Sequence, residues 1–129
     1  MILVVRREGK QLRRYVHLGT GNYHPSTARL YTDYGLFTCD GAIGIDVQKI
    51  FHQITAPGRT GKLKKLLQSP FTLHKTMIEF IEREAKNARA GKPARIIAKM
   101  NALIEVGIIQ ALYEASRAGV KIDLIIRGV

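Results

Sequence analysis

The chain has 129 residues, 46% of them hydrophobic, so it is long enough for one domain with a buried core and too apolar for a disordered segment. Twenty-one Lys and Arg against ten Asp and Glu give a net charge of +11, which attracts nucleic acid, acidic lipid or polyphosphate without choosing among them. The short apolar runs exclude a membrane-spanning helix, and the single cysteine, Cys39, excludes an internal disulfide. We expect Cys39 to be buried in a cytoplasmic protein.

The first part of the chain predicts a β-hairpin and then a turn. Residues 2–5 and 12–18 have the composition of strands, and Gly9 lies in the segment that joins them. A glycine-rich turn over residues 19–25 follows, so that His17 lies near the end of a strand. Residues 28–38 are mixed, and we expect them to be extended in part and broken near Gly35.

Two helices are predicted in the middle of the chain. Asp40 is placed to cap a helix that reaches about residue 55, and Pro57-Gly58 would end it. Its buried face is expected to carry Val47, Ile50, Phe51 and Ile54. Thr72 would cap a second helix to about residue 90, with a buried stripe of Leu73, Met77, Phe80 and Ile81. Between the helices, a solvated basic loop is expected to hold Arg59, Lys62, Lys64 and Lys65.

The last part of the chain predicts a βαβ unit. A strand over residues 96–100 is followed by a helix over about 101–118, with Gly119 at its end. Residues 122–126 are apolar apart from Asp123, which is typical of a parallel strand in a core. We therefore predict the α/β class, with a mixed sheet, flanking helices and a single domain over residues 1–129.

Candidate functional residues gather between Tyr15 and Asp33. Gly19 and Gly21 let backbone N–H groups approach an anion, and His17 can donate to a phosphate or be phosphorylated. Arg29 offers a planar set of donors that matches phosphate geometry. The Gly-x-Gly spacing fits neither the dinucleotide-binding pattern nor the P-loop, so spacing alone favours a plain β-turn. A structural, hydrogen-bonded histidine is likewise the alternative for His17.

The whole segment resembles the most recognisable block of the polyphosphate kinase family, enzymes that make inorganic polyphosphate from ATP through a phosphohistidine. The resemblance continues in order over residues 47–54, 66–71, 99–101 and 126–128. The family's catalytic half has two domains similar to phospholipase D, and this chain resembles most of the first. The resemblance implies a partial phospholipase-D-like domain over residues 1–129, with the nucleophilic histidine of a His-x-Lys motif upstream of Met1. We expect such a fragment to be inactive alone.

The resemblance also assigns roles to individual residues. His17 would be an accessory catalytic residue close to the absent nucleophile, and Tyr31 and Arg127 would contact the nucleotide. Gly19-Thr20-Gly21-Asn22 looks like the Gly-Ser-x-Asn element of phospholipase-D-like enzymes, in which the asparagine amide holds phosphoryl oxygens. The expected phosphate contacts are Gly19, Gly21, Asn22, Arg29, Lys99 and Asn101. Helix capping is an equally good explanation of Asn101, and no metal ligand is assigned, since Asp33 alone makes no metal site.

For the intact enzyme, the resemblance implies reversible transfer of the terminal phosphate of ATP to polyphosphate, with Mg²⁺ as cofactor. It also implies a homo-oligomer in the cytoplasm or at the inner face of the membrane, without a nucleic-acid partner. The alternative is a non-catalytic basic module that binds polyanions or nucleic acid, for which the charge alone suffices. A phospholipase- or nuclease-like hydrolase is a third class with the same superfamily fold.

Overall fold

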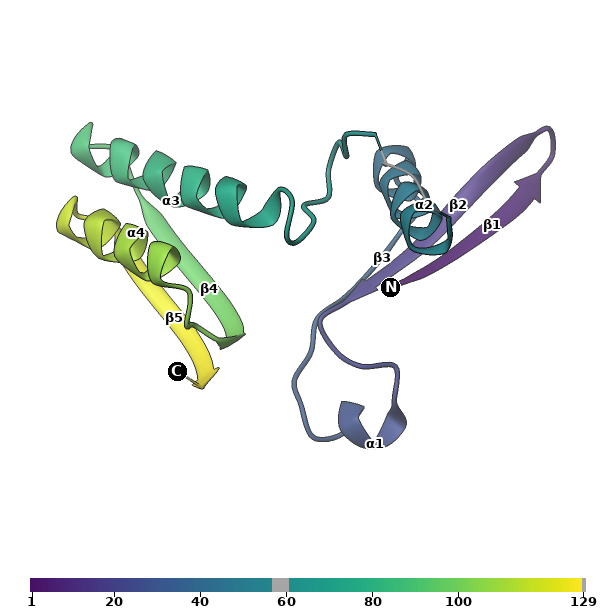
Figure 1. Cartoon of the computed structure of the whole chain (residues 1–129), viewed down its shortest axis with the longest axis horizontal. Helices are drawn as coiled ribbons and strands as arrows, with labels where there is room; N and C mark the ends of the chain where they lie inside the picture. Colours follow the sequence, from purple (N-terminus) through teal and green to yellow (C-terminus); the bar gives the residue numbers. More distant parts are fainter. Residues whose placement is uncertain (57–60, 129) are drawn as a thin grey trace. The chain divides into compact units, whose positions relative to one another are not determined.

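A computed structural model of the chain describes residues 1–56 and 61–128. The chain divides into two units, Met1–Leu66 and Leu67–Val129, each with its own sheet and helices (Figure 1). The sequence predicted one domain over residues 1–129 with one mixed sheet. Within the described residues the strands instead form a three-stranded antiparallel sheet and a two-stranded parallel sheet, so both orientations occur but not in one sheet. The α/β class is confirmed.

The first unit is built on the predicted hairpin, which the structure confirms. Strand β1 (Ile2–Glu8) pairs antiparallel with β2 (Gln11–Gly19), and Gly9 takes a φ of 60° in the turn, where a side chain would be strained. Strand β3 (Gly35–Thr38) adds to the other side of β2. The single helical turn α1 (Pro25–Ala28) lies between β2 and β3.

Helix α2 (Gly41–Thr55) follows β3 and packs on β2. Asp40 caps it as predicted, with a carboxylate oxygen that accepts a hydrogen bond from the Ile43 N–H at 2.9 Å. Val47 is fully buried, but Ile54, two turns further on, is 70% exposed. The prediction for Ile54 was wrong because only the first half of this helical face is covered. The predicted stop at Pro57-Gly58 lies outside the described residues.

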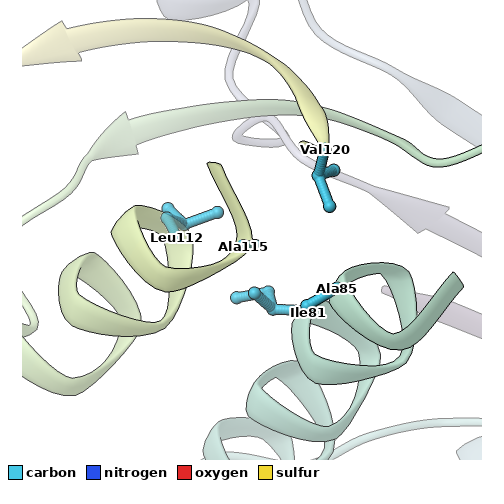
Figure 2. Close-up of a cluster of buried hydrophobic side chains, with 5 residues drawn as sticks. All are labelled: Ile81, Ala85, Leu112, Ala115 and Val120. Atoms are coloured by element: carbon cyan, nitrogen blue, oxygen red, sulfur yellow. The ribbon is translucent and has the colours of Figure 1, made fainter. Parts of the chain in front are cut away.

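The second unit contains the predicted βαβ arrangement. Helix α3 (Leu73–Arg89) precedes β4 (Arg95–Ala102), α4 (Val106–Arg117) and β5 (Lys121–Gly128), and β4 pairs parallel with β5. Figure 2 shows the core of this unit, in which side chains of α3, α4 and the residue before β5 point toward one another: Ile81, Ala85, Leu112, Ala115 and Val120. The helices and strands predicted here are confirmed, apart from their boundaries.

Three details of the second unit differ from prediction. Ile81 is buried as predicted, but Leu73, Met77 and Phe80 are each about two-fifths exposed, because the buried face of α3 continues from Ile81 to Ala85. Helix α4 begins at Val106 rather than near residue 101, because residues 101–102 complete β4. The parallel strands are covered on one face only: Ile97 is 63% and Ile125 is 56% exposed.

Two expectations from composition can also be compared with the structure. No helix in the described part of the chain is long and apolar enough to cross a bilayer. Cys39 is exposed rather than buried, since it follows the edge strand β3. Its sulfur accepts a hydrogen bond from the Arg13 guanidinium at 3.3 Å.

Candidate functional site

The first unit contains a cavity of about 500 Å³ where β2 ends and the glycine-rich turn meets the segment before β3. Five residues that the sequence assigned to the site line it: His17, Gly19, Gly21, Asn22 and Tyr31. The remaining walls come from Tyr23, Ala28 and the segment over residues 32–35. The fold therefore gathers these predicted residues around one space, and their roles stay predictions.

The imidazole of His17 is held from two sides. Its Nδ1 lies 2.8 Å from the hydroxyl of Tyr23, within hydrogen-bond distance. Phe37, its partner in the β2–β3 register, places its ring against the imidazole with centroids 4.3 Å apart and planes 32° from parallel. These contacts hold the ring through its Nδ1 edge and one of its faces, and Nε2 is the nitrogen on the opposite edge.

Two glycines, Gly19 and Gly35, pack against the imidazole of His17. A Cβ on Gly35 would lie 2.9 Å from Nε2 of His17, and a Cβ on Gly19 would lie 3.2 Å from Cε1. Both positions line the cavity, so Nε2 lies beside its glycine wall. Of the two glycines predicted to approach an anion, Gly19 therefore packs against the histidine ring, as Gly35 does.

The turn after β2 is tied to the segment before β3. The Thr20 hydroxyl donates to the Asp33 carboxylate at 2.9 Å and accepts from the Tyr34 N–H at 3.0 Å. A Cβ on Gly21 would overlap the same carboxylate. Glycine at position 21 is therefore needed for this close approach, and Thr20 holds the loop that carries Asn22.

Asn22, Tyr31 and Arg29 occupy different places around the turn. Asn22 and Tyr31 are exposed and line the cavity. Arg29 directly follows α1, is exposed and is not among the residues that line the cavity. The structure therefore places the Asn22 amide and the Tyr31 phenol at the predicted site, whereas the Arg29 guanidinium does not line the cavity.

The other predicted contacts lie in the second unit, on the parallel strands. Lys99 and Asn101 belong to the carboxyl-terminal half of β4, and Arg127 lies near the end of β5. The register pairs Met100 with Ile126, which brings Asn101 and Arg127 to the same edge of this sheet. Helix capping does not explain Asn101, because Glu105 caps α4 through the N–H groups of residues 107 and 108.

Asp46 is a structurally important residue that the sequence analysis missed. It is fully buried in α2 and accepts hydrogen bonds from the backbone N–H groups of Lys64, Lys65 and Leu66 at 2.6–3.1 Å. Burial acts to raise the pKa of this carboxyl, but the three N–H donors outweigh it and hold the pKa below the ordinary value of 3.8. A lone acid among the apolar residues of α2 is the sequence signal for such a contact.

Asp46 also determines where part of the predicted basic cluster lies. It anchors the backbone of Lys64 and Lys65, and the Lys49 ammonium donates to the Lys62 carbonyl at 2.8 Å. The lysine side chains of this segment are exposed, as expected for a solvated loop. Arg59, also predicted to belong to the cluster, lies outside the described residues.

The described residues do not form a magnesium site by themselves. They contain no group of three His, Cys, Asp or Glu side chains that could hold a metal ion. Asp33 is the carboxylate on the cavity wall, and it already accepts from Thr20 and packs against Gly21. The residues of this cavity therefore do not fit Mg²⁺ without ligands from elsewhere.

Comparison with known proteins places the two units in one family. The family model described as polyphosphate kinase C-terminal domain 1 matches residues 1–60, and that of C-terminal domain 2 matches residues 66–129. The boundary between the matches falls close to the boundary between the two units. We expected the chain to be most of the first phospholipase-D-like catalytic domain. The matches correct this expectation, because they assign the chain to two successive C-terminal domains of the family.

Individual relatives agree with these matches. A protein of Neisseria meningitidis serogroup C named polyphosphate kinase is 61% identical over 129 residues, which are 100% of this chain and 19% of the relative. Relatives of the same name in Burkholderia multivorans and Xylella fastidiosa are 64% and 62% identical, over 100% and 99% of this chain and 19% and 18% of their own lengths. The chain thus spans about one fifth of the length of the relatives it matches. It belongs to the polyphosphate kinase family.

Proposed function

We propose that this chain is part of an enzyme that reversibly transfers the terminal phosphate of ATP to inorganic polyphosphate through a phosphohistidine. Family membership supports this activity, and the cavity around His17 is the observation that carries it. The cavity suits a group that carries several negatively charged oxygens. It combines a nitrogen of His17 beside two glycines with the Asn22 amide and the Tyr31 phenol.

The roles proposed for the cavity residues follow from their positions. His17 would act through Nε2 as an accessory donor to a phosphoryl oxygen. Asn22 would donate its amide to another oxygen, and Tyr31 would contact the nucleotide through its phenol or its ring. These donors would stabilise the charge that spreads over the phosphoryl oxygens during in-line transfer. Arg29 takes no part in this proposal, because it is not on the cavity wall.

The covalent acceptor of the phosphate is proposed to lie outside this chain. By resemblance, a His-x-Lys histidine elsewhere in the longer protein attacks the γ-phosphorus, so this chain alone should transfer no phosphate. Both units would then be parts of phospholipase-D-like domains, and Lys99, Asn101 and Arg127 would contact phosphate or nucleotide from the second unit. Mg²⁺ would enter with the nucleotide. We also propose that the full-length enzyme is a homo-oligomer in the cytoplasm, part of it at the inner face of the membrane.

The test uses the full-length polyphosphate kinase that contains this chain, incubated with γ-labelled ATP. A phosphohistidine retains label that is labile in acid and stable in base, whereas a hydrolase releases free phosphate. We expect His17→Ala to lower polyphosphate synthesis at least 100-fold, the scale on which a catalytic donor contributes. His24→Ala is the matched control, because His24 lies outside the cavity wall, with its Nδ1 3.1 Å from the Thr27 hydroxyl. Equal synthesis by both variants would contradict the role of His17.

The basic-module alternative rests on the net charge of +11. It predicts that nucleic acid and polyphosphate bind with similar affinity and that no label is retained on the protein. Retained label together with a preference for polyphosphate would exclude it.

A further inference from the structure

We propose that Tyr23 is the residue that positions His17, by fixing which imidazole nitrogen carries the proton. The inference rests on the proposed function, because it gives the purpose of holding this ring. Tyr23 is not among the residues that sequence or family resemblance assigned to the site.

The first observation is the contact itself. Tyr23 follows Asn22 on the turn, and its hydroxyl returns to lie 2.8 Å from Nδ1 of His17. The two rings meet edge to face, with centroids 5.5 Å apart and planes at 66°. Tyr23 is 56% exposed, so burial is not what holds its ring in this place. A hydrogen bond to the imidazole accounts for the orientation of an exposed phenol.

The second observation is the packing of His17 on its other sides. Phe37 covers one face of the imidazole at 4.3 Å between centroids. A Cβ on Gly35 would lie 2.9 Å from Nε2 and a Cβ on Gly19 would lie 3.2 Å from Cε1, so the ring packs closely against both glycines. A ring flip would exchange the two edges of the imidazole and remove Nδ1 from the Tyr23 hydroxyl. The hydrogen bond therefore selects one of the two flipped orientations, and the packing holds the ring in its plane.

The chemistry of a phenol makes this selection useful in both charge states of the histidine. A phenol is a stronger hydrogen-bond donor than acceptor, so in the neutral ring we infer that the Tyr23 O–H donates to Nδ1 and that the imidazole proton resides on Nε2. In the charged ring, Nδ1–H donates to the Tyr23 oxygen, and Nε2 again carries a proton. Nε2 is thus a hydrogen-bond donor at the cavity in either state, which is what a phosphoryl oxygen requires. Tyr23 acts through His17 and is a positioning residue.

The direct test is nitrogen-15 NMR of the histidine side chains in this chain, at a pH where the imidazoles are neutral. His17→Gln identifies the His17 signals. We expect wild-type His17 to be protonated at Nε2 only, with Nδ1 accepting a hydrogen bond. Tyr23→Phe keeps the ring and removes the hydroxyl, so the Nδ1 resonance should shift and a mixture of the two tautomers should appear.

The controls separate positioning from folding. Tyr113→Phe changes an exposed tyrosine of α4 in the second unit and should leave the His17 signals in place. In Tyr23→Phe, unchanged signals of His52 and His74 would show that the chain still folds. Identical His17 nitrogen shifts in wild type and Tyr23→Phe would overturn the inference, as would a proton on Nδ1 in the neutral wild-type ring.

Kinetics of the full-length enzyme link the tautomer to function. Tyr23→Phe should lower kcat about tenfold, because the donor is misplaced, with KM for ATP within twofold of wild type. A changed tautomer with unchanged kcat would overturn the positioning role in the reaction. Full activity of His17→Ala would instead remove the proposed role of His17 and leave the NMR result intact, so the two failures are distinguishable.

Discussion

Asp46 shows how one buried side chain determines the path of a surface segment. Its carboxylate is fully buried and accepts hydrogen bonds from three consecutive backbone N–H groups, those of Lys64, Lys65 and Leu66. Three donors compensate for the loss of water around a buried charge. The contact joins α2 to the basic segment, and so the stability of the first unit depends on it.

Asp46→Asn should destabilise the first unit by about 3 kcal/mol, because the neutral amide keeps only one acceptor oxygen and turns its NH₂ group toward a backbone N–H that now donates to the carboxylate. Urea titration followed through the backbone NMR signals of α2 measures this free energy of unfolding unit by unit. Asp40→Asn is the matched control, since asparagine caps a helix as well as aspartate, and it should change stability by less than about 0.5 kcal/mol. Equal midpoints for both variants would contradict the account of Asp46.

The same carboxylate predicts a pH dependence. The pKa of Asp46 is lowered in the folded chain, so its contribution is complete above the unfolded value of 3.8 and is lost as the pH falls through the lower folded value. Wild type should therefore lose stability in the first unit below about pH 4, and Asp46→Asn should lose less over the same range. Some slope should persist in the variant, because the Tyr15 hydroxyl lowers the pKa of Glu8 in the same unit. Parallel stability curves would show that Asp46 does not titrate as described.

Gly35 provides a test of the histidine's packing. Gly35→Ala places a methyl group 2.9 Å from Nε2 of His17, so the imidazole must move away. We expect the His17 side-chain signals to shift and polyphosphate synthesis by the full-length enzyme to fall about tenfold. Gly41→Ala is the control, because a Cβ at Gly41 meets nothing within 4 Å and alanine favours the helix there. An unchanged His17 spectrum in Gly35→Ala would contradict the described geometry.

At the scale of elements, the core of the second unit depends on the contact of α3 and α4 with each other and with β5. Leu112 is 7% exposed in this core, whereas its neighbour Tyr113 is 67% exposed on the same helix. Leu112→Ala should cost about 3 kcal/mol through lost burial and the cavity left behind, and Tyr113→Ala should cost less than about 1 kcal/mol. Urea titration followed by the signals of β5 measures both. Similar losses would mean that the buried face of α4 is wrongly assigned.

The elements were predictable where local chemistry determines them. The hairpin follows from Gly9, the start of α2 from Asp40, and the end of α4 from Gly119, whose φ is 97°. The buried faces were harder, because burial depends on what covers an element. Ile54 lies on the same helical face as Val47, yet Ile54 is 70% exposed and Val47 is fully buried. Periodicity gives the face, but only the packing partner gives its extent.

At the scale of the whole molecule, the sequence predicted a phosphate site, and the structure places some of the predicted residues around one cavity. His17 and Asn22 line one cavity with the two glycines and Tyr31, whereas Arg29 is off its wall. The sequence did not indicate Tyr23 or Phe37. Tyr23 reaches His17 because the turn folds back on β2, and Phe37 reaches it because β3 pairs with β2. Single-residue chemistry identifies candidate donors, and tertiary structure decides which of them share a ligand.

Charge acts over the whole chain as well. A net charge of +11 should draw polyphosphate to many surface lysines and arginines, with an affinity that falls as salt rises. This attraction alone would make the chain a basic module. The phosphotransferase account requires more, namely that phosphate reaches Nε2 of His17 and the Gly19–Asn22 turn.

Titration of the isotope-labelled chain with tripolyphosphate, followed by NMR against sulfate at equal ionic strength, tests that requirement most directly. The account predicts that the His17 imidazole signals and the amides of Gly19, Gly21 and Asn22 shift together and saturate, and that sulfate does not reproduce the effect. Shifts confined to surface segments such as Arg6–Arg7 and Lys62–Lys65, with an unmoved His17, would contradict it.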